Sequence, residues 1–87
     1  MPPTPAVVLP REPVNLTRLR VGAEARYHGA RLERVDLDIL ESLGLTDDCR
    51  LRVCQTRDPW VVQVRATRIA LADSIARAIL VVPEVEP

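Results

Sequence analysis

Apolar and polar residues alternate in several short runs of this chain, and this pattern limits the folds that it can form. Residues 50–53 alternate between arginine and an apolar side chain, and a second run covers residues 60–65 after the pair Asp58-Pro59. Because successive side chains of a strand point to opposite faces of a sheet, a period of two indicates strands with one buried face. The Asp-Pro pair is typical of a turn, so these two runs predict paired strands. A similar run predicts a strand at 23–27 that Gly29 ends, and short apolar segments predict two more strands, at 69–71 and at 79–82.

The segment 32–43 has a different period. Its apolar residues are three or four positions apart, which is the spacing of one face of a helix. Gly44 is placed to end this helix in a left-handed cap, and Asp36 and Asp38 lie near its start, where carboxylates suit the helix dipole. A single helical turn is also predicted over 73–76, with Asp73 as its N-cap. The apolar positions of the main helix are Leu32, Val35, Ile39, Leu40 and Leu43.

The predicted elements describe a mainly β domain with one main helix and a short helical turn before the last strand. A sheet this small could not protect exposed edges, so we expect a small, closed, five-stranded barrel. The length of 87 residues suits one core but leaves no room for a separate buried catalytic cleft. Five prolines predict that residues 1–15 form a flexible tail, the folded domain covers 16–82, and 83–87 form a short C-terminal tail.

The composition argues against several classes of function. Twelve basic residues, all arginine, balance twelve acidic ones, so no net charge concentrates the chain on nucleic acid or an anionic membrane. The longest apolar runs are far shorter than the roughly 20 residues of a membrane span, and the proline-broken start does not resemble a signal peptide. Two cysteines fit a reducing compartment better than a disulfide framework. We therefore expect a cytoplasmic protein and, with no catalytic motif present, not an enzyme.

Two stretches carry a resemblance to a known family. They are Leu43-Gly44-Leu45-Thr46 and the ending I-A-L-x4-A-x2-I-x-V over 69–81, preceded by Leu16, Leu19 and Gly22. In this order and at these separations, they resemble the FeoA family, the ferrous iron transport protein A domain. The resemblance implies an SH3-like barrel and an accessory role in ferrous iron uptake beside FeoB, a membrane GTPase. Similar domains also occur at the C-terminus of iron-dependent repressors.

The chain departs from the family pattern at two turns. Family members usually have a proline-glycine turn shortly after LGLT, where this chain has Asp47-Asp48. Members also usually turn on glycine between the later strands, where this chain has Ala66-Thr67. Aspartate tolerates turn conformations, so the first change is mild. Alanine at a positive φ would be strained, so we expect a different shape for the second turn.

Candidate partner-binding residues are apolar, aromatic or basic. Leu45 follows the helix-ending glycine and could project as an apolar contact, although a hydrophobic cap contact explains it equally. Trp60 either packs in the core or rim beside Val62 and Val64, which we favour, or forms a binding hot spot. The outward faces of neighbouring strands should share Arg50, Arg52 and Arg65, which could receive an acidic partner surface.

We predict no cofactor and no metal site. If a ferrous or other divalent ion were bound, the candidate ligands would be His28, Asp47, Asp48 and Cys49. Cys49 and Cys54 are five residues apart, which places them on opposite faces of a strand, and Cys54 is expected to pack as a small apolar side chain.

Three functions remain open at this stage. The first is a non-enzymatic accessory protein of ferrous iron uptake that binds the cytoplasmic part of a FeoB-like transporter and meets the membrane only through that partner. The second is a metal-responsive SH3-like regulatory module that binds a transition metal ion. The third is an SH3-like module with a proline-rich or nucleic-acid ligand, against which the few aromatic residues and the zero net charge argue.

Overall fold

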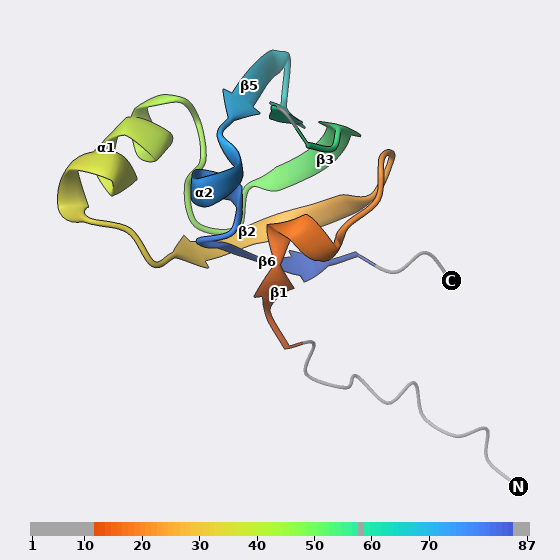
Figure 1. The fold of residues 1–87 in the computed structure, drawn as a ribbon, viewed down its shortest axis with the longest axis horizontal. Helices are drawn as coiled ribbons and strands as arrows, with labels where there is room; N and C mark the ends of the chain where they lie inside the picture. The colour runs from red at the N-terminus through yellow and green to blue at the C-terminus, as the bar shows by residue number, and fades with distance from the viewer. Residues whose placement is uncertain (1–11, 58, 85–87) are drawn as a thin grey trace, which may run out of the picture.

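The computed structural model describes residues 12–57 and 59–84, and Figure 1 shows a mainly β fold. The predicted strands, main helix and short helical turn are confirmed, and a short sixth strand precedes them. The elements in chain order are β1 (Val14–Asn15), the 3-10 turn η1 (Leu16–Arg18), β2 (Glu24–Ala30), α1 (Arg34–Ser42), β3 (Arg50–Gln55), β4 (Trp60–Val64), β5 (Thr67–Leu71), α2 (Asp73–Ala76) and β6 (Ile79–Pro83). None of the helices in these residues is long and apolar enough to cross a membrane.

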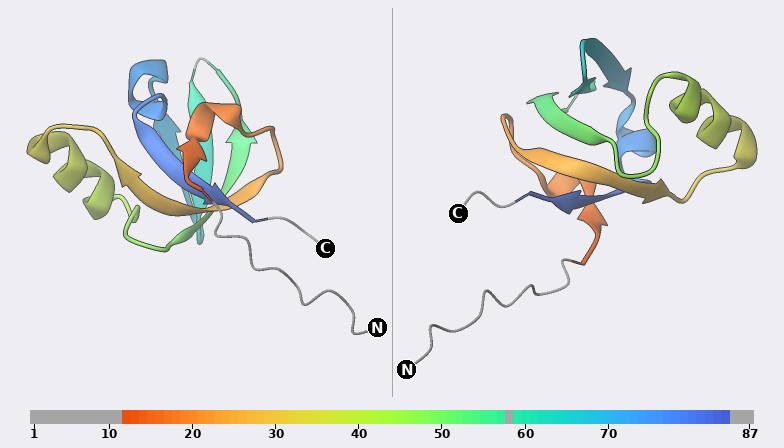
Figure 2. Two further views of the ribbon diagram at one scale, coloured as in Figure 1. Left: turned by 90° about the horizontal axis from the view of Figure 1, so that it is seen from below. Right: turned by 180° about the vertical axis from the view of Figure 1, so that it is seen from behind.

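The strands form one curved antiparallel sheet in the order β1-β6-β2-β3-β4-β5, which the two views in Figure 2 show from below and behind. The expected full closure of the barrel is corrected here. Within the described residues, β5 and β1 are the two edges of the sheet, and no strand pairing joins them. Because β1 has only two residues, it offers little free backbone to another chain.

Alternate side chains of the strands fill the interior, as the period-two runs predict. Ala25 and Tyr27 point inward from β2, while their neighbours Glu24 and Arg26 remain at or near the surface. The strand continues past Gly29 to Ala30, so Gly29 does not end it. The pairing of β2 with β6 shifts its register between Tyr27 and Gly29, as at a β-bulge. The other buried core residues are Leu16, Leu40, Leu45, Leu51, Val53, Trp60, Val62, Val64, Ile69, Leu71, Ala76, Ile79 and Val81.

Helix α1 ends in a Schellman motif, which confirms the predicted left-handed cap. Gly44 has a φ of 110°, and its N–H donates to the carbonyl of Glu41 at 3.0 Å. The next N–H, of Leu45, donates to the carbonyl of Leu40 at 3.0 Å. These two bonds satisfy carbonyls that the end of a helix leaves without partners. The side chains of Leu40 and Leu45 are both buried.

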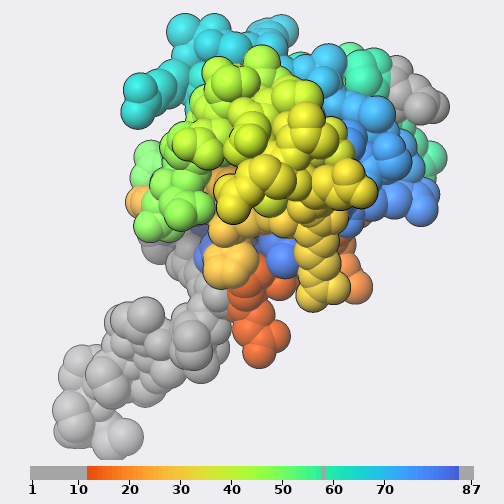
Figure 3. Space-filling model, turned by 90° about the vertical axis from the view of Figure 1, so that its left-hand side faces the viewer, coloured from red at the N-terminus to blue at the C-terminus, as the bar shows by residue number. Residues whose placement is uncertain are grey.

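The apolar face of α1 is only partly buried. Leu40 packs in the core, but Val35, Ile39 and Leu43 are 60%, 51% and 43% exposed. We call these three residues the α1 strip. They are four positions apart and therefore share one face of the helix. Figure 3, which faces α1, shows the yellow-green helix residues at the front of the molecule. The sequence predicts this apolar stripe correctly, but the sheet covers only one side of it.

The helical turn α2 is confirmed, but its cap differs from the prediction. Ala72 is the N-cap, and Asp73 is the first residue of the turn. The Asp73 carboxylate instead accepts a hydrogen bond from the indole N–H of Trp60 at 3.1 Å. It also forms an ion pair with Arg77, whose Nε lies 2.7 Å from Oδ2 of Asp73. Asp73 thus links α2 to the start of β4.

The folded unit begins earlier than residue 16 and continues beyond residue 82. Val14 and Asn15 pair with Val81 and Leu80 of β6, so they belong to the sheet and not to the predicted tail. At the other end, the N–H of Glu84 donates to the carbonyl of Glu24 at 3.0 Å. Residues 1–11 and 85–87 of the predicted tails, and Asp58 of the predicted Asp-Pro turn, lie outside the described residues.

Candidate functional site

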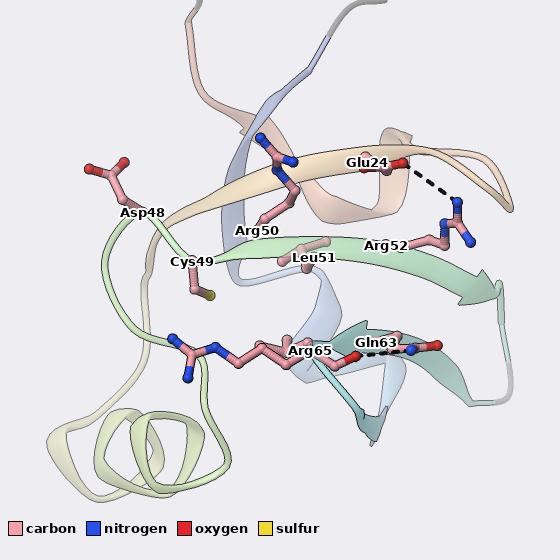
Figure 4. A pocket seen from close by; sticks show the side chains of 9 residues that line it. Glu24, Asp48, Cys49, Arg50, Leu51, Arg52, Gln63 and Arg65 are labelled. Carbon is pink, nitrogen blue, oxygen red and sulfur yellow. Dashed lines mark hydrogen bonds and ion pairs between the residues drawn. The ribbon is translucent and has the colours of Figure 1, made fainter.

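Three arginines that the sequence assigns to one outward face line a single open hollow. Arg50 and Arg52 come from β3, and Arg65 comes from the turn between β4 and β5. The hollow has a volume of about 500 Å³, and Figure 4 shows the three side chains arranged around it. We call it the arginine hollow. Its other lining residues are Glu24, Asp48, Cys49, Leu51, Gln63 and Val64.

Three arginines in or near the arginine hollow form ion pairs with only two carboxylates, those of Glu24 and Glu84. Nη2 of Arg52 lies 3.5 Å from Oε1 of Glu24. Nε of Arg50 lies 3.1 Å from Oε1 of Glu84, and Nε of Arg26 lies 3.0 Å from the same oxygen. Arg26 and Arg50 are directly opposite each other on β2 and β3, where two like charges would be destabilising. Glu84 offsets this repulsion because its carboxylate bridges both guanidinium groups.

The turn that carries Arg65 avoids a positive φ at Ala66 and lies one residue earlier than the expected Ala66-Thr67. Thr67 pairs with Val64 and already belongs to β5, so the two turn residues are Arg65 and Ala66. Arg65, not Ala66, takes the positive φ, at 56°. The side-chain amide of Gln63 donates to the Arg65 carbonyl at 2.9 Å. Among the described residues, no carboxylate lies within ion-pair distance of the Arg65 guanidinium.

The structure places the two apolar partner candidates in the core. Leu45 is 2% exposed and makes the hydrophobic cap contact that we weighed as its alternative role. Trp60 is 4% exposed, which agrees with core or rim packing and not with an exposed hot spot. Its indole N–H is already bonded to Asp73. Neither side chain is therefore available to a partner without opening the core.

The four candidate metal ligands lie near the start of β3 and on β2. His28 is exposed on β2, Asp47 and Asp48 are exposed in the turn before β3, and Cys49 is partly buried against the core. Asp48 has a φ of 64°, a left-handed turn conformation that aspartate tolerates better than most residues. In residues 12–57 and 59–84, no three histidine, cysteine, aspartate or glutamate side chains form a group that could hold a metal ion.

The two cysteines lie on different sides of the sheet, as their spacing predicts, but their roles are exchanged. Cys49 packs against the hydrophobic core. Cys54 does not, and its Sγ lies 3.8 Å from Oε1 of Gln63 on the outer side of β4. The expectation that Cys54 packs as an apolar side chain is therefore wrong. Leu51 and Val53 face the core, so the regular alternation of β3 places Cys54 on the outer face with Arg50 and Arg52. Both thiols are free.

Tyr27 is a titratable group whose environment is clearly perturbed. Burial raises the pKa of its phenol above the ordinary value of 10.0, and the negative charge of Asp47 raises the pKa further. Backbone bonds join this part of β2 to the turn before β3, because the Tyr27 N–H donates to the Cys49 carbonyl at 2.8 Å. Because its pKa is raised, the Tyr27 phenol stays uncharged, which suits its place in the hydrophobic core.

Sequence reasoning missed two residues that form ion pairs next to the arginine hollow, Arg26 and Glu84. The alternation of β2 does place Arg26 on the outer face, but its neighbour across the ladder depends on a register that a single sequence does not show. Glu84 falls in the predicted C-terminal tail, so its bridge to Arg26 and Arg50 could not be expected.

Comparison with solved structures confirms the SH3-like fold that the resemblance implies. An iron uptake regulatory protein, FeoA, is similar with a TM-score of 0.75 at 20% identity, over 84% of this chain and 100% of that chain. The FeoA protein from Chlorobium tepidum has a TM-score of 0.77 at 23% identity, over 83% of this chain and 71% of its own. T. acidophilum IdeR has a TM-score of 0.78 at 28% identity, over 88% of this chain but only 37% of its own.

No curated protein matches the chain. A model of the FeoA domain family matches residues 14–83, which agrees with the folded unit from β1 to the end of β6. Because this match spans most of the sequence, the chain belongs to the FeoA domain family.

Proposed function

We propose that this protein is a non-enzymatic, cytoplasmic accessory protein of ferrous iron uptake that binds the cytoplasmic part of a FeoB-like membrane GTPase. The observation that carries the proposal is the FeoA domain match over residues 14–83. Membership of this family implies involvement in ferrous iron uptake. We expect a domain of this size to act through its surface, because one small core leaves no room for a separate buried cleft.

Two surface features support an interaction role. The α1 strip exposes three large apolar side chains on one helix face, and exposed apolar patches often mark protein interaction sites. Beside it, a groove of about 180 Å³ runs between α1, the end of β5 and α2. On another part of the surface, the arginine hollow presents guanidinium groups that suit carboxylates.

A capture experiment tests the proposal. The full chain is immobilised and mixed with the purified GTP-binding cytoplasmic part of a FeoB-like transporter, under reducing conditions, with and without nucleotide. We expect saturable capture in at least one nucleotide state. A Val53→Asp variant, which buries a charge in the core and should unfold the domain, is the control for non-specific adsorption. No capture in any state, or equal capture by the unfolded control, would refute the proposal.

The metal-responsive module is the second candidate, and the likeness to IdeR at 28% identity is the observation that favours it. The described residues supply no assembled ligand group, which leaves it behind the first candidate. Calorimetric titration of the chain with ferrous or manganous ion decides the question. Saturable heat that is lost on replacing Asp47 and Cys49 would support this function, and the absence of heat would remove it.

A further inference from the structure

We infer that the arginine hollow binds an acidic, extended segment of a partner protein, with Arg65 as the arginine that is free to receive it. The inference rests on the proposed function only in that the domain recognises another protein. It does not require that this protein be a transporter.

The first argument is the local charge. Three arginines line the arginine hollow against two carboxylates, those of Glu24 and Asp48. The pairs that Arg50 and Arg52 make are long or shared, and these two side chains are 59% and 60% exposed. Exposed ion pairs of this kind are weak, so a partner carboxylate can replace them at little cost.

The second argument is the backbone of Arg65. A non-glycine residue at a φ of 56° is strained, and glycine would relieve that strain in a two-residue turn. Arg65 is also exposed, so the folded core gains no packing from it. Arg65 is an arginine at a position that suits glycine, and Figure 4 shows its side chain extended among the residues that line the arginine hollow, which indicates a use for this side chain outside the fold.

The third argument is an internal precedent. Glu84 follows β6 as extended chain, its N–H bonds to the Glu24 carbonyl, and its carboxylate is held by Arg26 and Arg50. One arginine of the arginine hollow, Arg50, therefore already binds a carboxylate from the chain that follows a strand. A partner segment with spaced acidic residues would repeat this contact on Arg50, Arg52 and Arg65, where the planar guanidinium fork matches carboxylate geometry.

An acidic peptide fits this surface better than a nucleic acid does. The carboxylates of Glu24 and Asp48 line the arginine hollow and would repel a continuous phosphate backbone. The lining also contains no aromatic side chain on which bases could stack. Spaced carboxylates can avoid Glu24 and Asp48, whereas a charge at every nucleotide cannot.

The test measures binding of a fluorescent peptide of alternating glutamate and serine to the full chain by anisotropy at low salt. We expect saturable binding that weakens as salt is added, and no binding of the matching glutamine-serine peptide. Arg65→Gly should weaken binding about tenfold while its thermal midpoint stays equal or rises. Arg65→Asn, which tolerates the same φ, should lose as much affinity and excludes an effect of turn shape.

Two further variants locate the site. Arg34→Gln removes an exposed positive charge on α1, outside the arginine hollow, and should leave the affinity within about twofold of the parent. Glu84→Gln removes the internal competitor and should tighten binding of the peptide. Unchanged affinity in both Arg65 variants, equal loss in Arg34→Gln, or tighter binding of a single-stranded oligonucleotide than of the peptide would overturn the inference.

The peptide experiment and the transporter capture experiment can fail independently of each other. If the peptide binds but the transporter fragment is not captured, the proposed partner is wrong and the acidic-segment site stands. If the transporter fragment is captured equally well by the parent and by Arg65→Gly, and the peptide does not bind, the accessory role stands and this site fails.

Discussion

Replacing Gly44 by alanine should destabilise the domain through the backbone alone. Gly44 sits at the C-terminal cap of α1 with a φ of 110°, a conformation that residues with a Cβ rarely adopt. A Cβ built at this position would lie 3.7 Å from Cγ1 of Val64, an ordinary van der Waals contact. The alanine side chain therefore fits in space, and any loss of stability comes from the dihedral angle.

The magnitude follows from two opposing terms. Forcing an alanine into a left-handed conformation costs about 1–2 kcal/mol, and 110° is beyond the usual left-handed well, which favours the upper end. Alanine also restricts the unfolded chain, which returns about 0.4–1 kcal/mol. We expect a net loss of about 1 kcal/mol, or a fall in the melting temperature of about 4–8 °C for a domain of this size.

Gly29→Ala is the matched control. Gly29 has no positive φ, and a Cβ built there meets nothing within 4 Å. The substitution should therefore be neutral or should stabilise the protein by up to about 1 kcal/mol. Urea unfolding followed by the fluorescence of Trp60 measures both variants. If Gly44→Ala were as stable as Gly29→Ala, the cap would not depend on the left-handed glycine and the assignment would be refuted.

Three other substitutions test the core, the link to α2 and the phenol. Ile79→Ala empties a fully buried site on β6 and should cost about 2–5 kcal/mol in urea unfolding; a loss below that of a surface substitution would contradict the core assignment. Trp60→Phe removes the donor to Asp73 and should cost about 1–3 kcal/mol, and the loss should shrink when Asp73 is already alanine. Tyr27 has a raised pKa in the folded state, so its contribution is fully present below about pH 10 and is lost as the pH rises through the folded pKa. Melting temperatures across this range should therefore fall less for Tyr27→Phe than for the parent, and equal falls would show that the phenol is not responsible.

Local patterns in the sequence predict the longer elements of this fold. Alternation identified the strands β2, β3 and β4, short apolar segments identified β5 and β6, and the spacing from Leu32 to Leu43, with Gly44 after it, identified α1 and its cap. The missed strand β1 has two residues and lies among prolines, so it has no periodicity to detect. Strand β1 forms because its backbone pairs with β6, a contact between residues that are far apart in the sequence.

The candidate site was predictable only in part, because its parts depend on register. Alternation placed Arg50, Arg52 and Arg65 on one outer face, and the structure brings them together. The bridge through Glu84 joins β2, β3 and the end of β6, and no local pattern encodes that pairing. The position of Trp60 also depends on tertiary contacts. An aromatic residue beside a turn can face the core or the solvent, and the bond from the Trp60 indole to Asp73 of α2 is not encoded in the local sequence.

Net charge was a poor guide to this surface because it sums over faces that carry opposite charges. The chain has a formal net charge of zero, yet three arginines meet in one hollow while helix α1 carries Asp36, Asp38 and Glu41 against one arginine. Sums of charge govern long-range attraction, whereas a contact is governed by the charges within about 10 Å, the screening length near physiological salt. A partner that recognises the arginine hollow therefore needs no overall charge of its own. It needs carboxylates spaced to reach Arg50, Arg52 and Arg65 together.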